Sequence, residues 1–251
     1  MEMKDIHTGK LFSTGMKMAE VPDADARLLG VMRRLGIRFG FGEKTVEEVC
    51  TENGVNPHTL LLICKIYIYD KYTPSREELS RSSISDIVTY LHSSHDFYTG
   101  VALAELEKDI AEMAETLDEK HRRIITKFCS EYKGEILKHF EYEESTVFPY
   151  IHKLASGELP DDYNIDLYEE SHSDVDEKLN DLKSIVMKYM PDSCDDNLIL
   201  NVLNCLYTLE NDLSKHTYIE DDILVPMVAE KEKSLRKHKN GDKQKDVELE
   251  I

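Results

Sequence analysis

The 251-residue sequence has no tryptophan and few residues that interrupt helices, with 11 glycines and 7 prolines. It also lacks any apolar run of about 18 residues, the length that a membrane-spanning helix needs. The first 20 residues contain no apolar stretch like the core of a secretory signal. These absences argue against a fibrous, a membrane-spanning and a secreted protein, and they favour a soluble helical one.

Cysteine is also scarce and is not arranged for disulfides or for a thiolate metal site. The five cysteines are odd in number and include no C-x-x-C pair: Cys50, Cys64, Cys129, Cys194 and Cys205. This usage predicts reduced thiols in a cytoplasmic protein. We expect each of them to be a small buried hydrophobic residue.

Basic residues are scarce in one part of the chain only. Residues 1–90 carry 12 basic and 13 acidic side chains, whereas residues 91–251 carry 19 and 37. The formal net charge is −19. Because so acidic a surface repels phosphate backbones, we expect no binding to nucleic acid by the larger part.

Residues 1–75 predict a small helical N-terminal domain. Thr45 and Glu48 form a capping-box pattern at the start of one helix, and Asn56 with Pro57 starts the next. The polar stretch 71–81 predicts a linker. A helix-turn-helix interpretation of this domain is weak, because its second helix is mostly apolar and a groove-reading helix needs basic side chains.

Four long helical patterns follow the linker. They cover about 83–117, 119–154, 163–189 and 195–230. Long helices with short connections predict an all-α antiparallel four-helix bundle over residues 82–230. The charged stretch 231–251 predicts a tail that frays.

The bundle sequence contains a pattern of histidines and glutamates that occurs twice, with an offset of 77 residues. The two sets are His95, His139 and Glu143, and His172, His216 and Glu220. A proline repeats as well, because Pro149 and Pro226 each lie six residues beyond the glutamate. Residues four apart share one helix face, so each His–Glu pair can point into the bundle core.

This repeated pattern predicts a metal centre of four imidazoles and two carboxylates. Six ligands, two of them able to bridge, suit two metal ions better than one. A nitrogen and oxygen shell with open positions is typical of iron or manganese, and those positions could accept a bridging oxide or hydroxide and a small ligand. Without metal, burying these groups would be costly, so a purely structural bundle is the less favoured alternative.

Other residues are candidates for a ligand or for a supporting position in this centre. His92 shares part of a face with His95, but the repeat selects His95 because it matches His172. Neighbouring acids are candidates to hold the imidazoles in place: Asp96, Glu144 and Asp174. The remaining histidines have no repeat partner, and we expect them at the surface.

The sequence resembles hemerythrin-like (HHE cation-binding) proteins over about residues 82–230. The resemblance is carried by His139-Phe-Glu-Tyr-Glu143, His216-Thr-Tyr-Ile-Glu220 and the apolar-Pro steps after them, together with Glu170-Ser-His172 and Leu91-His-Ser-Ser-His95. The set of four histidines and two glutamates is similar to that of the di-iron proteins that repair iron–sulfur clusters. The resemblance implies a cytoplasmic protein with a carboxylate-bridged, non-haem di-iron centre that responds to nitric oxide or oxidative stress.

The N-terminal domain resembles the small domain that precedes the bundle in the cluster-repair family. That family has a Cys-Cys pair where this chain has Gly40 and Phe41, so thiol chemistry is not expected here. Cys50 lies on the following helix and does not replace the pair. The domain could instead serve in packing or in forming a homodimer.

Two function classes follow from the resemblance. The first is repair of damaged iron–sulfur proteins by a di-iron protein that delivers iron or processes nitric oxide or peroxide. The second is a module that binds or senses oxygen or nitric oxide without repair activity, and the missing Cys-Cys pair favours it. The ligand pattern is compatible with an enzyme and with a binding protein.

Overall fold

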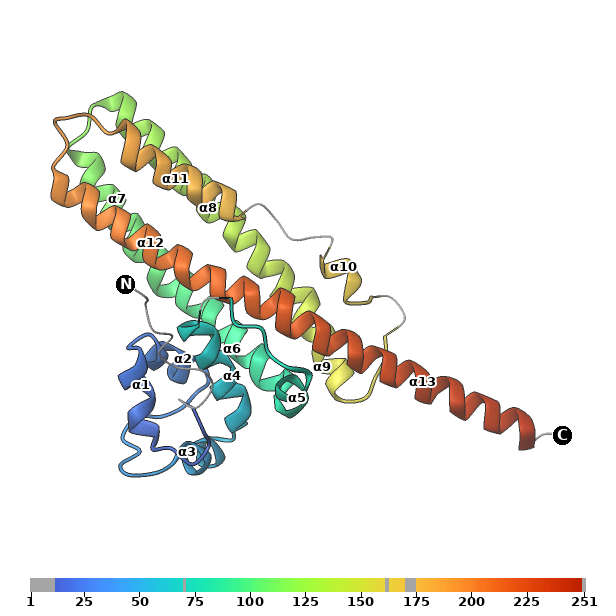
Figure 1. The fold of residues 1–251 in the computed structure, drawn as a ribbon. Helices are drawn as coiled ribbons and strands as arrows, with labels where there is room; N and C mark the ends of the chain where they lie inside the picture. The colour runs from blue at the N-terminus through green and yellow to red at the C-terminus, as the bar shows by residue number, and fades with distance from the viewer. Residues whose placement is uncertain (1–11, 70, 161–162, 170–174, 250–251) are drawn as a thin grey trace, which may run out of the picture. The chain divides into compact units, whose positions relative to one another are not determined.

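The computed structural model describes residues 12–69, 71–160, 163–169 and 175–249 (Figure 1). This described part is helical and contains no β-strand, only an isolated bridge between Lys17 and Thr45. The chain divides into two compact units. The first comprises Met1–Ser93 with Asp222–Met227, and the second comprises Ser94–Asp221 with Val228–Ile251.

The first unit is built from short helices. In chain order they are η1 (Met18–Glu20), α1 (Val21–Ala24), α2 (Leu28–Arg34), α3 (Val46–Asn53), α4 (Pro57–Ile68), α5 (Arg76–Arg81) and the start of α6 (Ile84–Phe97). The predicted capping box forms, because Thr45 accepts from the Glu48 backbone and Glu48 accepts from the Thr45 backbone. Gly54 ends α3 in the left-handed region at φ 69°, where a residue without Cβ is favoured.

Part of the predicted linker is helical. Helix α5 lies within residues 71–81, and its start has the same capping box, formed by Ser75 and Glu78. The stretch is polar, so it lacks the apolar periodicity by which a helix is predicted. Its short helix is instead stabilised by side-chain hydrogen bonds at its ends.

The second unit contains a four-helix bundle. Its helices are α7 (Leu103–Glu115), α8 (Glu119–Tyr142), α11 (Val175–Tyr189) and α12 (Asp196–Ile219). Helix α7 contacts α8 and α12, and α11 contacts the same two helices, so the four close into a ring. The unit also includes α9 (Phe148–Ala155), α10 (Asp166–Glu169) and most of α13 (Val225–Leu249). The predicted all-α bundle is confirmed.

The bundle core is apolar along most of its length. Buried side chains from all four helices meet there, including Leu106, Ile110, Met113, Ile125, Tyr132, Ile136, Leu179, Leu182, Val202 and Leu206. Burial of this apolar area supplies the main driving force for closing the ring of helices. It also creates the low-dielectric surroundings in which the polar residues at one end of the bundle must find partners.

The last helix is longer than the sequence predicts. Helix α13 continues to Leu249, although we expected residues 231–251 to fray. Its early turns are held by Glu232, which is buried and pairs with Arg236 one turn later. The following stretch is rich in lysine and glutamate, which favour helix, and this explains its continuation.

Candidate metal centre

Three helical segments bring the repeated residues of the second unit together. His95 lies near the end of α6, His139 near the end of α8 and His216 near the end of α12. Glu143 and Glu220 each begin a π-helical segment, η3 (Glu143–Val147) and η4 (Glu220–Leu224).

A proline follows each of these two π-helical segments. Proline lacks a backbone N–H, and in a regular α-helix its ring clashes with the carbonyl four residues earlier. Pro149 and Pro226 follow shortly after η3 and η4, and the wider π turn accommodates them. In η3 the N–H of Phe148 bonds to the carbonyl of Glu143, five residues back. The repeated proline was the sequence signal for these turns, but its helical consequence was missed.

Four of the six predicted ligands form one buried cluster. The ligand atoms of His95, Glu143, His216 and Glu220 all lie within 4.8 Å of one another. The Nε2 atoms of His95 and His216 are 3.1 Å apart. His95 Nε2 is 3.2 Å from Glu143 Oε2, and His216 Nε2 is 2.9 Å from Glu220 Oε1. The four side chains are at most 5% exposed.

The other candidates fall outside that cluster. His139 adjoins it through Glu143, with 3.4 Å between His139 Nε2 and Glu143 Oε1, and its side chain is 13% exposed. His172 and Asp174 lie outside the described residues. His92 is exposed, so the structure favours His95 over its neighbour, as the repeat does.

Hydrogen bonding sets the orientation of the His95 ring. Its Nδ1 donates to Glu144 Oε1 at 2.7 Å, so Nε2 faces the cluster and can bind an ion in exchange for its proton. Phe140 stacks on the same ring at 4.1 Å between centroids, and Phe148 at 5.5 Å. The expected role of Glu144 is thus seen, whereas Asp96 is exposed.

The cluster attracts positive charge. Burial lowers the pKa of His95, but the neighbouring carboxylates of Glu143, Glu144 and Glu220 raise it to about 9. Two buried carboxylates facing two imidazoles would otherwise be a costly arrangement in an apolar core. A cation bound among these four side chains would offset that cost.

The donor set also fits a metal ion in its spacing and chemistry. Two ligands about 2.1 Å from one ion and at right angles to each other are separated by about 3 Å, close to the distance between the two Nε2 atoms. Glu143 Oε2 is buried and accepts no hydrogen bond within the described part of the chain. Imidazole nitrogens and carboxylate oxygens suit iron, manganese or zinc.

Tyr168 is a member of the site that the sequence did not predict. Its buried hydroxyl donates to Glu143 Oε1 at 2.5 Å. The residue 77 positions earlier is Leu91, so the repeat gave no signal for it.

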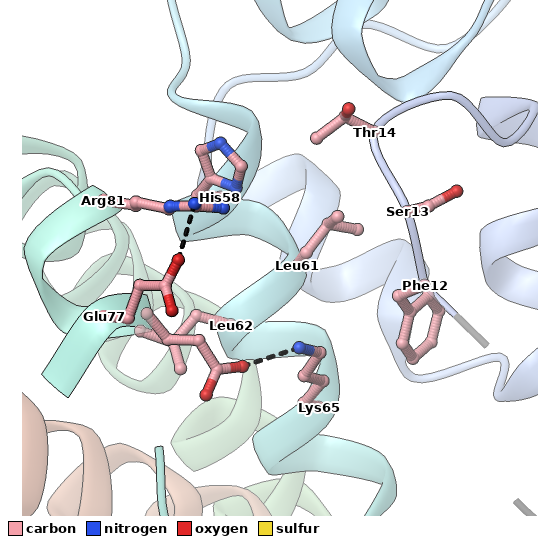
Figure 2. A pocket seen from close by; sticks show the side chains of 10 residues that line it. Phe12, Ser13, Thr14, His58, Leu61, Leu62, Lys65, Glu77 and Arg81 are labelled. Carbon is pink, nitrogen blue, oxygen red and sulfur yellow. Dashed lines mark hydrogen bonds and ion pairs between the residues drawn. The ribbon is translucent and has the colours of Figure 1, made fainter. Parts of the chain in front are cut away.

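The first unit has a separate hollow of about 300 Å³ (Figure 2). One face of α4 forms its floor, with Leu61 and Leu62, and Phe12 closes one side. Two ion pairs line it: Lys65 with Glu78 at 2.7 Å, and Arg81 with Glu77 at 2.6 Å. Because these charges neutralise each other locally, the hollow does not favour one sign of ligand charge.

The cysteines do not form a reactive centre. All five are free, four of them are buried, and Cys205 is half-buried. Burial raises the pKa of Cys50 to about 12, and those of Cys129 and Cys205 to about 11. These three thiols therefore stay protonated at neutral pH. The expected burial holds for four cysteines and fails for Cys205.

No helix within the described ranges has the length and apolar character needed to cross a bilayer.

Comparison with known proteins supports the interpretation of the bundle. Curated proteins give no match. The model of the hemerythrin HHE cation-binding domain matches residues 101–228, just over half of the chain. That range contains every repeated ligand candidate except His95, and the chain therefore belongs to the hemerythrin HHE cation-binding family.

Proposed function

We propose that this protein binds a pair of non-haem iron ions in its bundle. The ligands would be the six residues of the repeat: His95, His139, Glu143, His172, His216 and Glu220. The observation that carries the proposal is the buried cluster of two imidazoles and two carboxylates, drawn from both halves of the repeat. Two glutamates that can each bridge support a pair of ions over a single ion.

The surrounding residues orient the ligand side chains and shield them from water. Glu144 fixes the ring of His95, and Phe140 and Phe148 keep water from its faces. Tyr98 packs edge-on against His216, with 5.4 Å between ring centroids. When bound, the iron pair would supply electrons and an open position for oxygen, nitric oxide or peroxide.

The reaction we favour is repair of cytoplasmic iron–sulfur proteins damaged by nitric oxide or oxidative stress, through release of labile iron. The test incubates the iron-loaded protein with an iron–sulfur enzyme that nitric oxide has inactivated. We expect recovery of that enzyme's activity, and none with a Glu143→Ala/Glu220→Ala variant treated identically. Recovery no greater than that given by the same amount of free ferrous iron would contradict a repair role.

The second candidate is reversible binding of oxygen or nitric oxide without repair. Gly40 and Phe41 stand at the places of the Cys-Cys pair, and the nearby Cys50 is a buried, protonated thiol. These features favour a role without thiol chemistry. A spectral change that reverses when the gas is removed, with all iron retained against a chelator, would support this candidate over repair.

A further inference from the structure

The carboxylate of Glu143 uses its two oxygen atoms differently. Oε1 accepts the hydrogen bond from Tyr168 at 2.5 Å and lies 3.4 Å from His139 Nε2. Oε2 faces His95 Nε2 at 3.2 Å and accepts no hydrogen bond from the described residues. The phenol therefore holds one oxygen so that the other points at the cluster.

The segment that carries Tyr168 is anchored by a second buried carboxylate. Glu232 Oε1, on α13, accepts from the Ile165 backbone N–H at 2.9 Å and from the Tyr150 hydroxyl at 2.6 Å. Ile165 directly precedes α10, the short helix on which Tyr168 lies. Glu232 is 6% exposed, so these hydrogen bonds are shielded from competing water.

Aromatic contacts reinforce this anchor. The rings of Tyr150 and Tyr163 pack with centroids 4.8 Å apart. The Tyr163 hydroxyl lies 3.1 Å from that of Tyr142, the residue immediately before Glu143. A four-residue helix such as α10 has little stability of its own, so these contacts determine where Tyr168 is held.

We propose that Tyr168 is a positioning residue of the metal centre and that Glu232 anchors the segment that presents it. The inference rests on the proposed function, because it requires Glu143 to be a ligand. Hydrogen bonds to a ligand fix its orientation and tune its strength, and their loss typically weakens metal binding by about 10–100-fold. The two halves of the centre are then unequal, since the repeat places Leu91, which has no hydroxyl, where the other half has Tyr168.

The test compares Tyr168→Phe with Tyr132→Phe, which removes another buried phenol hydroxyl from the bundle core. The ferrous iron affinity is measured by competition with a chelator, and the carboxylate infrared bands are recorded on the metal-free proteins. We expect an affinity about 10-fold weaker and a shifted carboxylate band for Tyr168→Phe, with neither change for Tyr132→Phe. Equal affinities for Tyr168→Phe and the unmodified protein, or equal losses in the two variants, would overturn the proposal.

Glu232 is tested by a matched pair of variants. Glu232→Gln keeps an oxygen that can accept both hydrogen bonds, whereas Glu232→Leu removes it. We expect near-normal iron affinity for the glutamine variant and a loss close to that of Tyr168→Phe for the leucine variant. In a Tyr168→Phe background, Glu232→Leu should cause little further loss. A full additional loss would overturn the anchoring role.

Measuring the unmodified protein first separates this inference from the proposed function. If that protein binds no iron, the proposed function fails. If it binds iron and Tyr168→Phe binds it equally well, only the positioning role fails.

Discussion

The Nε2 atoms of His95 and His216 lie 3.1 Å apart in the second unit, although 121 residues separate them in the sequence. One belongs to each half of the repeat. Glu143 and Glu220 complete the cluster from the same two halves. The candidate metal centre is therefore the place where two copies of one helical pattern converge, and neither copy supplies it alone.

His95, rather than His92, should be the ligand from α6. Its side chain is buried in the cluster, whereas that of His92 is exposed. His95→Ala should weaken iron binding by at least about 10-fold, and His92→Ala should leave it unchanged within about twofold. Metal analysis after dialysis against a chelator distinguishes them, and a greater loss in His92→Ala would contradict this assignment.

Pro149 should matter for metal binding more than for stability. Without the proline, the chain after Glu143 can return to a regular α-helix, which moves Phe148 away from its contact with the His95 ring. We expect Pro149→Ala to reduce iron affinity by about 10-fold while the melting temperature of the metal-free protein stays the same or rises. Pro160→Ala, in the following loop, is the control, and equal affinities for the two variants would refute this role.

The ion pair of Lys65 and Glu78 should make the first unit sensitive to acid. Burial raises the pKa of Glu78, but hydrogen bonds from Lys65, Tyr72 and Ser75 lower it to about 2. Because the folded-state pKa lies below the usual value of 4.5, this stabilisation is complete above about pH 4.5 and is lost as the pH falls toward 2.

The corresponding experiment is urea unfolding of metal-free Glu78→Gln at several pH values. We expect a loss of about 1 kcal/mol at pH 7, because partial exposure of the pair weakens it, and a smaller difference at pH 3. Glu77→Gln, on an exposed pair, should cost less than about 0.5 kcal/mol. A Glu78→Gln effect that does not change between pH 7 and pH 3 would contradict the pKa assignment.

The thiols should react slowly in the folded protein. Four of the five are buried, and the half-buried Cys205 has a pKa raised to about 11 by burial. A thiol reagent at pH 7.5 should modify Cys205 first, and all five cysteines only after unfolding. Rapid modification of Cys50 in the folded protein would instead indicate a reactive thiol in the first unit.

The sequence predicted most of the fold because its helices carry local signals. The Thr45 capping box and the Gly54 helix end were visible in the residues themselves. The capping box of Ser75 and Glu78 has the same form, yet it was missed because a polar stretch with a proline resembles a linker. The extension of α13 depends partly on Glu232, whose partners come from distant segments.

The site was predictable to the extent that it repeats. The offset of 77 residues selected all four members of the buried cluster. Tyr168 has no repeat partner, and it contacts Glu143 from a short helix preceded by Ile165, whose backbone N–H donates to Glu232. Such a contact is set by tertiary packing and leaves no spacing pattern in the chain.

The most direct test is the metal content and absorption spectrum of protein purified without oxygen, beside a Glu143→Ala/Glu220→Ala variant. We predict about two irons per chain with near-ultraviolet absorption, and loss of both in the variant. A folded protein without iron, or a single zinc ion that the variant retains, would contradict a di-iron centre at these residues.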